Sequence, residues 1–198
     1  MEQKRNVAIL IFDEVEVLDF CGPFEVFGVT GYKDSIAPFN VYTVAEGLGP
    51  VIARNGLSIN PAYTIADCPR PDILVVPGGL GTRKEMDNPV LCEWIEDRVK
   101  EAELTLSVCT GALMLAKAGL LEGVSATTHH DGMELLKELA PEAVIEEKER
   151  FIDNGRIVLS AGISAGIDTS LHVVAKLLGT EQSLKTARYM EYEWEPAL

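Results

Sequence analysis

The sequence predicts an α/β protein in three layers, with a doubly wound, mostly parallel sheet that carries helices on both faces. The first observation is a set of short, continuous apolar runs, which are typical of strands buried on both faces of a parallel sheet. The second is that segments with helical apolar spacing alternate with these runs. The buried runs cover residues 7–12, 39–45, 73–76 and 104–108.

In the first half of the chain, a helix is expected between the first two buried strands. Pro23 favours the first turn of that helix, because a proline there sacrifices no backbone hydrogen bond. Short alternating pieces between 51 and 59 are broken by Asn55-Gly56, a pair typical of β-hairpin turns. The third buried strand then stops at a Pro-Gly-Gly sequence over residues 77–79.

The second half continues the alternation of strands and helices. Apolar residues three and four apart predict a helix over 89–100, ahead of the fourth buried strand. The Asn154-Gly155 pair predicts a second hairpin, over 151–158. The remaining expected elements are a short strand at 125–128 and helices over about 112–118, 133–139, 163–178 and 181–189.

Composition limits the class of protein. The chain has 198 residues, 47% of them hydrophobic, which suits one domain over residues 1–198. Its net charge of -14 argues against a nucleic-acid partner, because phosphate binding needs a basic surface. No apolar run approaches the roughly 18–20 residues of a membrane span, and no apolar leader opens the chain. We therefore expect a cytoplasmic protein that acts on a small molecule, without membrane or nucleic-acid partners.

The four cysteines are Cys21, Cys68, Cys92 and Cys109. None forms a C-x-x-C pair, and no spacing of cysteine and histidine matches a zinc site. In a reducing compartment we expect four free thiols and no bound metal.

The segment 106–112 has the pattern of a nucleophile elbow with Cys109 at its tip. An apolar strand ends at the cysteine, and small residues begin a helix at once. A helix N-terminus favours thiolate over thiol, so Cys109 is a candidate nucleophile. The alternative is a buried structural cysteine, the usual fate of a free one.

Two other segments follow buried strands and should meet Cys109 at the carboxyl edge of the sheet. The backbone N–H groups of Gly79 and Leu80 could form an oxyanion hole, or belong to a plain Pro-Gly turn. A phosphate loop is disfavoured, because the Gly-Lys-Ser/Thr ending is missing. Asp19 is a candidate general acid or base, with a helix cap or a solvated charge as the alternative.

Two histidines, His129 and His130, follow the short strand at 125–128. One could orient or deprotonate Cys109, and the other would then be a loop residue. His172 falls in an expected helix and is interpreted as a packing or surface residue.

Five motifs, together and in order, resemble the ThiJ/PfpI family of the class I glutamine amidotransferase-like superfamily. They are DFCGP at 19–23, VPGGLG at 76–81, VCTGA at 108–112, ATTH at 126–129 and SAGISAGID at 160–168. The likeness covers nearly the whole chain and implies a flavodoxin-like fold and a homodimer. Within the family, the motifs are most similar to those of isonitrile hydratases.

The resemblance implies that Asp19, Cys109 and Thr110 are the catalytic residues. It also implies oxyanion donors in the backbone around Gly79 and Thr110, places the family's histidine on His129 and requires no cofactor. Glycines 162 and 166 would be structural. The module also occurs fused to helix-turn-helix regulators, and because this chain ends at residue 198 we expect no DNA-binding half.

Three functions follow as hypotheses. The first is a cysteine-dependent hydratase that converts an isonitrile to an N-substituted formamide, as Asp19 with Thr110 indicates by resemblance. The second keeps the cysteine but changes the substrate to a 2-oxoaldehyde or an amide. The third is a non-enzymatic redox sensor or stress protein, in which Cys109 oxidises readily. Protease-like members carry histidine after the nucleophile, so Thr110 argues against a peptidase.

Overall fold

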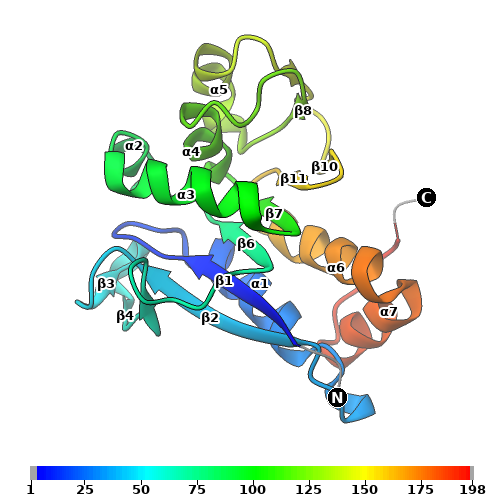
Figure 1. Ribbon diagram of the computed structural model, residues 1–198. Coiled ribbons are helices and arrows are strands. Elements are labelled where there is room, and N and C mark those ends of the chain that lie inside the picture. The colour runs from blue at the N-terminus through cyan, green and yellow to red at the C-terminus, as the bar shows by residue number, and fades with distance from the viewer. Residues whose placement is uncertain (1–3, 197–198) are drawn as a thin grey trace.

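The computed structural model describes residues 4–196 and is built around a seven-stranded sheet (Figure 1). Only the pair at one edge is antiparallel, and every other neighbouring pair is parallel. The predicted α/β class, with a mostly parallel sheet, is therefore confirmed. The strands, in spatial order, are β10 (Phe151–Asp153), β11 (Ile157–Ser160), β7 (Leu104–Ser107), β6 (Ile73–Val76), β1 (Arg5–Leu10), β2 (Phe39–Ala45) and β5 (Tyr63–Thr64).

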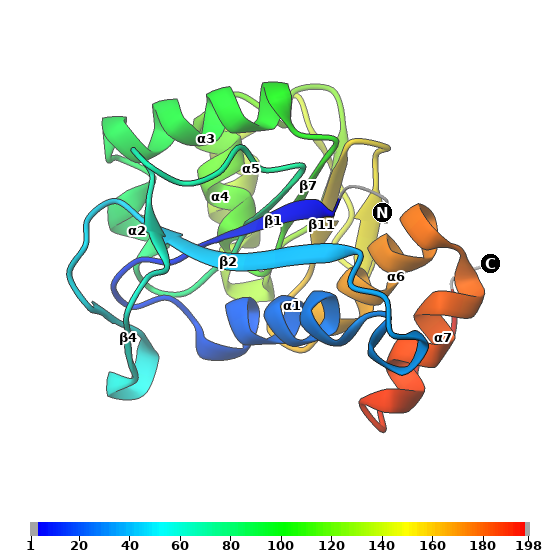
Figure 2. The same ribbon diagram turned by 60° about the horizontal axis from the view of Figure 1, so that its bottom comes forward.

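Helices lie on both faces of the sheet, which gives the expected three layers (Figure 2). On one face lie α3 (Pro89–Glu101) and α4 (Gly111–Lys117), and on the other lie α1 (Val17–Val29) and α6 (Ala165–Leu178). The remaining helices pack on these: α2 (Thr82–Glu85) and α5 (Met133–Leu139) on α4, and α7 (Thr180–Tyr189) on α6. None of the helices in the described part of the chain is long and apolar enough to span a bilayer.

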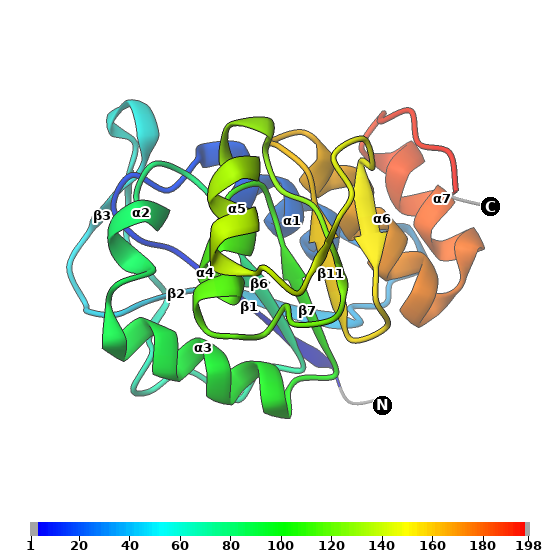
Figure 3. The same cartoon turned by 90° about the horizontal axis from the view of Figure 1, so that it is seen from above.

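Short elements extend from this framework. A hairpin of β3 (Val51–Ile52) and β4 (Ser58–Ile59) encloses a 3-10 turn, η2 (Arg54–Gly56). In a second small sheet, β8 (Ser125–Ala126) pairs in parallel with β9 (Val144–Ile145), near α5 (Figure 1). The β10–β11 hairpin is visible from above (Figure 3). Two more 3-10 turns are η1 (Tyr32–Asp34) and η3 (His130–Gly132).

Both predicted hairpin turns are confirmed. Asn55 and Gly56 have φ values of 61° and 81°, the left-handed backbone for which such pairs are favoured. Gly155 has a φ of 87° between β10 and β11. The sequence identified these turns because asparagine and glycine tolerate this backbone better than other residues.

Two boundaries differ from those expected. Helix α1 begins at Val17, so Pro23 lies inside the helix rather than in its first turn. A proline there removes the N–H that would otherwise bond the carbonyl of Asp19, and burial of the helix's apolar face offsets this loss. Consequently Asp19 lies within the first turn of α1, not before it. The strand expected at 125–128 ends at Ala126.

The centre of the sheet positions the candidate site. Strands β6 and β7 are buried along their whole length, as is the second half of β1. Beyond their carboxyl ends, the N–H of Glu16 donates to the carbonyl of Gly78 at 2.9 Å, and Val15 forms a single β-bridge with Gly79. The N–H of Val108 donates to the carbonyl of Val76 at 3.0 Å. The three segments predicted to converge are therefore joined by backbone hydrogen bonds.

Candidate active site

Cys109 occupies the tip of a strained turn between β7 and α4. Its φ is 56°, in the left-handed region that a non-glycine residue adopts only when its surroundings enforce it. Its N–H is shared between the carbonyls of Ser160 and Ala161, each at 3.2 Å. The hydroxyl of Thr128 donates to its carbonyl at 2.7 Å. These bonds on both sides of the residue hold the elbow that the strand-cysteine-helix pattern predicted.

Asp19 is fully buried and lies beside the thiol of Cys109. Its Oδ2 accepts a hydrogen bond from the N–H of Gly78 at 3.1 Å. Its Oδ1 completes no hydrogen bond of ordinary geometry with any described residue. Burial raises the pKa of the carboxyl group to about 7, although the contacts with Cys109 and Gly78 oppose the shift. Asp19 is therefore a carboxyl group that can gain or lose a proton near neutral pH.

The protonation of Cys109 differs from the sequence-based expectation. The residue is 5% exposed, and burial together with the charge of Asp19 raises the pKa of its thiol to about 12. The N–H groups of Ile163 and Thr110 face the sulfur and lower the pKa, but by less. The expectation of a resting thiolate at a helix N-terminus is thus wrong. Desolvation and a neighbouring carboxylate outweigh the helix and its donors.

Thr110 joins the pair through the close approach of Gly78. A Cβ atom at Gly78 would lie 2.5 Å from the Thr110 nitrogen, 2.7 Å from Thr110 Oγ1 and 2.9 Å from Asp19 Oδ2. Any side chain would displace these groups, because real Cβ contacts are longer than this. The threonine hydroxyl and the aspartate therefore both lie against the backbone of Gly78.

The glycine loop supplies fewer free donors than expected. The N–H of Gly78 is taken by Asp19, and the N–H of Gly79 donates to Thr110 Oγ1 at 3.0 Å. The N–H of Leu80 forms no hydrogen bond within residues 4–196, and its side chain is 56% exposed. The prediction of Gly79 as a direct oxyanion donor is therefore not supported by its bonding. Leu80 retains an available N–H group.

His129 lies at the edge of the site rather than in contact with the pair. Its Nδ1 accepts a hydrogen bond from the N–H of Asp131 at 3.2 Å, and within the described chain no hydrogen bond joins its ring to Cys109 or Asp19. Partial burial and the nearby His130 lower its pKa, which favours a neutral imidazole. Its ring packs so closely on Gly162 that a Cβ there would lie 2.1 Å from it.

A pocket of about 530 Å³ opens next to the elbow. Thr128 and Ile163, which contact the carbonyl and the sulfur of Cys109, both belong to its wall. His129, Met133 and Arg150 form other parts of the wall. The volume lies within the range of small-molecule sites. Neither Cys109 nor Asp19 belongs to this wall, so Thr128 and Ile163 connect the pocket to the elbow. A separate hollow of about 210 Å³ near Glu85 likewise contains neither residue.

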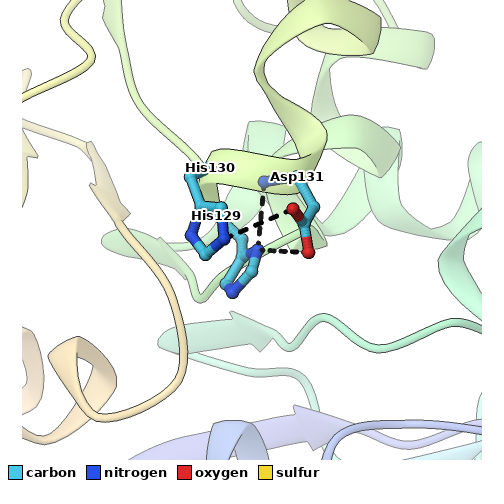
Figure 4. Close-up of side chains that lie close together, drawn as sticks. All are labelled: His129, His130 and Asp131. Carbon is cyan, nitrogen blue, oxygen red and sulfur yellow. Dashed lines mark hydrogen bonds and ion pairs between the residues drawn. The ribbon is translucent and has the colours of Figure 1, made fainter.

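Three consecutive side chains at the pocket mouth come close enough to consider a metal ion (Figure 4). Donor atoms of His129, His130 and Asp131 lie within 4.8 Å of one another. Their proximity follows from their adjacency in the chain, and two of the three are exposed. The Nδ1 of His129 already accepts from the backbone. We assign these residues no metal.

Comparison with known proteins decides the family. A model of the DJ-1/PfpI family matches residues 5–176, which includes the elbow, the glycine loop and Asp19. The chain belongs to the DJ-1/PfpI family. The resemblance seen in the five motifs is thereby confirmed.

Relatives of this DJ-1/PfpI chain differ in the functions for which they are named. Isonitrile hydratase of Pseudomonas putida is 34% identical over 96% of this chain and 80% of that protein. Protein DJ-1alpha of Drosophila melanogaster is 29% identical over 97% of this chain and 86% of its own. The HTH-type transcriptional regulator CdhR of Pseudomonas aeruginosa is 27% identical over 81% of this chain but only 51% of the regulator. Membership of the family alone therefore does not specify a reaction.

A solved structure supports the same assignment. A THiJ/PfpI family protein from Pseudomonas syringae superposes with a TM-score of 0.87 at 31% identity. The match covers 99% of this chain and 78% of that one. DJ-1beta of Drosophila melanogaster, at 20% identity and a TM-score of 0.82, shares the fold.

Sequence reasoning missed several groups that shape this DJ-1/PfpI site. The N–H of Gly78 that binds Asp19, the N–H of Ile163 that faces the sulfur and the hydroxyl of Thr128 were given no such roles. Backbone donors leave no signature in the sequence, because every residue but proline has one. Thr128 lay inside a quoted motif, and a hydroxyl after a strand near the elbow was the available signal.

Proposed function

We propose that this protein is a cysteine-dependent hydratase that converts a small isonitrile to an N-substituted formamide. The observation that carries the proposal is the pairing of Cys109 with Asp19, a buried carboxyl group whose pKa lies near 7. Its unpartnered Oδ1 leaves one oxygen available to a reacting group. The 34% identity with an isonitrile hydratase, over most of both chains, supports the choice of substrate.

The first step attaches the isonitrile carbon to Cys109. Asp19, as the carboxylate, takes the proton of the thiol as the sulfur bonds to the terminal carbon. The same proton then passes from Asp19 to that carbon, which gives an S-linked thioimidate with a carbon–nitrogen double bond. No proton is gained or lost overall. A neutral resting thiol is compatible with this step, because the base lies beside it.

The second step releases the product. A water molecule adds to the thioimidate carbon while Asp19 takes one of its protons. Asp19 passes this proton to the nitrogen, and it then takes the remaining hydroxyl proton as the carbon–sulfur bond breaks and the carbon–oxygen bond becomes the formyl carbonyl. The sulfur recovers its proton from Asp19, so the enzyme is restored. The sum is one isonitrile plus one water giving one N-substituted formamide, and the scheme requires no cofactor.

The surrounding residues take supporting roles in this proposal. The hydroxyl of Thr110, the residue that follows Cys109, would hold the intermediate. The free N–H of Leu80 would bind developing negative charge, and Gly79 would act through Thr110. His129 would contact the substrate's substituent from the wall of the pocket. A homodimer in the cytoplasm remains a prediction.

A panel of alkyl and aryl isonitriles tests the proposal, with formamide measured by mass spectrometry. We expect formamide from the wild type, none above background from Cys109→Ala, and unchanged formation from Cys68→Ala, a partly buried thiol outside the site. No formamide from the wild type would contradict the reaction. Methylglyoxal turnover that depends on Cys109, without isonitrile turnover, would instead support the 2-oxoaldehyde alternative. The redox-sensor alternative is disfavoured, because such sensors use exposed cysteines of low pKa.

A further inference from the structure

Thr82, the first residue of α2, lies directly behind the candidate catalytic threonine. Its side chain is fully buried. Its Oγ1 lies 2.8 Å from the carbonyl oxygen of Gly79 and 3.2 Å from Oγ1 of Thr110. Arg83 reaches the same Oγ1 from the outside at 3.3 Å and the Gly79 carbonyl at 3.4 Å, and the N–H of Thr82 donates to that carbonyl at 3.3 Å. Thr82 is thus a buried hydroxyl within reach of two groups that define the site.

The hydrogen bonds can be assigned by counting protons. Each threonine hydroxyl has one proton and can accept two bonds. The shortest contact gives the Thr82 proton to the carbonyl of Gly79, while the N–H of Gly79 donates to Thr110 Oγ1 at 3.0 Å. The Thr110 proton then has only long contacts, at 3.2 Å to the Gly79 carbonyl and 3.2 Å to Thr82. Ordinary O–H···O bonds are shorter, at about 2.7–2.8 Å.

We propose that Thr82 is a positioning residue that keeps the hydroxyl proton of Thr110 available to the reacting group. The Gly79 carbonyl can accept two hydrogen bonds. The Thr82 hydroxyl takes one place at 2.8 Å, and the N–H of Thr82 and the side chain of Arg83 approach the other, so the carbonyl does not draw the Thr110 hydroxyl into a full-strength bond. The Gly79 N–H meanwhile fixes the orientation of the Thr110 oxygen. This inference rests on the proposed function, in which Thr110 holds the intermediate. A simple helix-capping role would make a different prediction, because it would affect stability alone.

Crystal structures of Thr82 variants test the positioning without any assay. In Thr82→Val the Gly79 carbonyl loses its shortest donor and keeps only the longer contacts from the N–H of residue 82 and from Arg83. The distance from Thr110 Oγ1 to that carbonyl should therefore shorten from 3.2 Å to about 2.8 Å. In Thr82→Ser the hydroxyl is retained and the distance should stay near its present value. Should the valine variant fail to fold, the distance from Thr110 Oγ1 to the Gly79 carbonyl can be measured in Thr82→Ala, which also lacks the hydroxyl. An unchanged distance in the variant that lacks the hydroxyl would overturn the inference.

Kinetics test the consequence. For Thr82→Val we expect kcat to fall by about tenfold to a hundredfold with little change in KM, as for loss of a transition-state hydrogen bond. Thr82→Ser should recover most of the rate, and Thr82→Val should add nothing in a Thr110→Val background. Thr169→Val, which removes a buried 2.7 Å hydroxyl-to-carbonyl bond within α6, serves as control and should retain wild-type kcat.

The outcomes separate this inference from the proposed function. An active wild type with unchanged kcat in Thr82→Val, or with additive losses in the double variant, would overturn the role of Thr82. An inactive wild type would overturn the hydratase. The crystallographic distance would still decide whether Thr82 controls the hydrogen bonding of Thr110.

Discussion

At the scale of single residues, the site depends on the proton affinities of Asp19 and Cys109. Full burial makes the carboxylate of Asp19 costly, so its pKa rises to about 7. The charge that Asp19 carries when ionised then raises the pKa of the Cys109 thiol further. Above neutral pH the two groups hold one proton between them, and that proton resides on sulfur. Near neutral pH, Asp19 is consequently the group that gains or loses a proton, while the thiol of Cys109 stays protonated.

We predict that kcat/KM for isonitrile hydration rises with pH and has its midpoint near 7. Only the carboxylate of Asp19 can take the thiol proton, and this form becomes populated as pH rises through the pKa of about 7. Asp19→Asn should reduce the rate by at least about a hundredfold and remove the midpoint. Glu16→Gln should move the midpoint to lower pH, because the charge of Glu16 helps raise the pKa of Asp19. A flat profile from pH 5.5 to 8.5 would contradict this role.

At the scale of elements, the site is made by close approaches between segments that follow separate strands. The segment after β6 brings Gly78 against both Asp19 on α1 and Thr110 at the start of α4. Farther along the chain, the segment after β11 places Ile163 beside the sulfur and Gly162 beneath His129. Small residues at these points allow backbone atoms to approach functional side chains.

Gly78→Ala should therefore lower kcat strongly while leaving the rest of the fold in place. The new methyl group would lie 2.5–2.9 Å from Thr110 and Asp19, so these groups or the loop itself must shift. Gly28→Ala is the matched control, because its methyl group meets nothing within 4 Å on the exposed side of α1. We expect at least about a hundredfold loss of kcat for the first variant, since small displacements of catalytic groups cost about that much, and wild-type kcat for the second. Circular dichroism spectra check that both variants fold. Equal kcat values for the two folded variants would contradict this role of Gly78.

The whole molecule shows which features a sequence can predict. The buried runs, the two hairpins at Asn55-Gly56 and Asn154-Gly155, and the elbow at Cys109 follow from local chemistry, and the structure confirms each. The protonation of Cys109 did not follow, because it depends on burial by segments distant in sequence. The start of α1 was misplaced for a related reason: packing of the helix on the sheet and on α6 tolerates Pro23 in its interior.

The buried Asp19 should also control how global stability changes with pH. Its pKa is raised from 3.8 to about 7 on folding, so its contribution is greatest below pH 3.8 and is lost as pH rises through 7. Asparagine cannot ionise, so Asp19→Asn removes this decrease in the free energy of unfolding with pH. We expect the difference in unfolding free energy, variant minus wild type, to grow by roughly 3–4 kcal/mol between pH 4 and pH 8. Urea unfolding at each pH measures it.

For a comparison variant at Asp67, we expect the pH dependence of stability to change in the opposite direction. The pKa of Asp67 is lowered by hydrogen bonds from Thr64, so its carboxylate stabilises the fold at higher pH. Asp67→Asn should therefore lose stability relative to the wild type as pH rises. If both variants changed in the same direction, the assignment of the shifted pKa to Asp19 would be wrong.

The measurement that most directly tests the pairing of Cys109 with Asp19 is the ionisation of the thiol itself. Thiolate absorbance near 240 nm, taken as wild type minus Cys109→Ala, should show no ionisation of Cys109 from pH 5 to pH 9. The absorbance of Asp19→Asn minus that of the Asp19→Asn/Cys109→Ala double variant reports the thiol without the aspartate. This thiol should ionise at lower pH than in the wild type, because a neighbouring negative charge has been removed. Thiolate already present in the wild type at pH 6, or an identical titration in both backgrounds, would contradict the account.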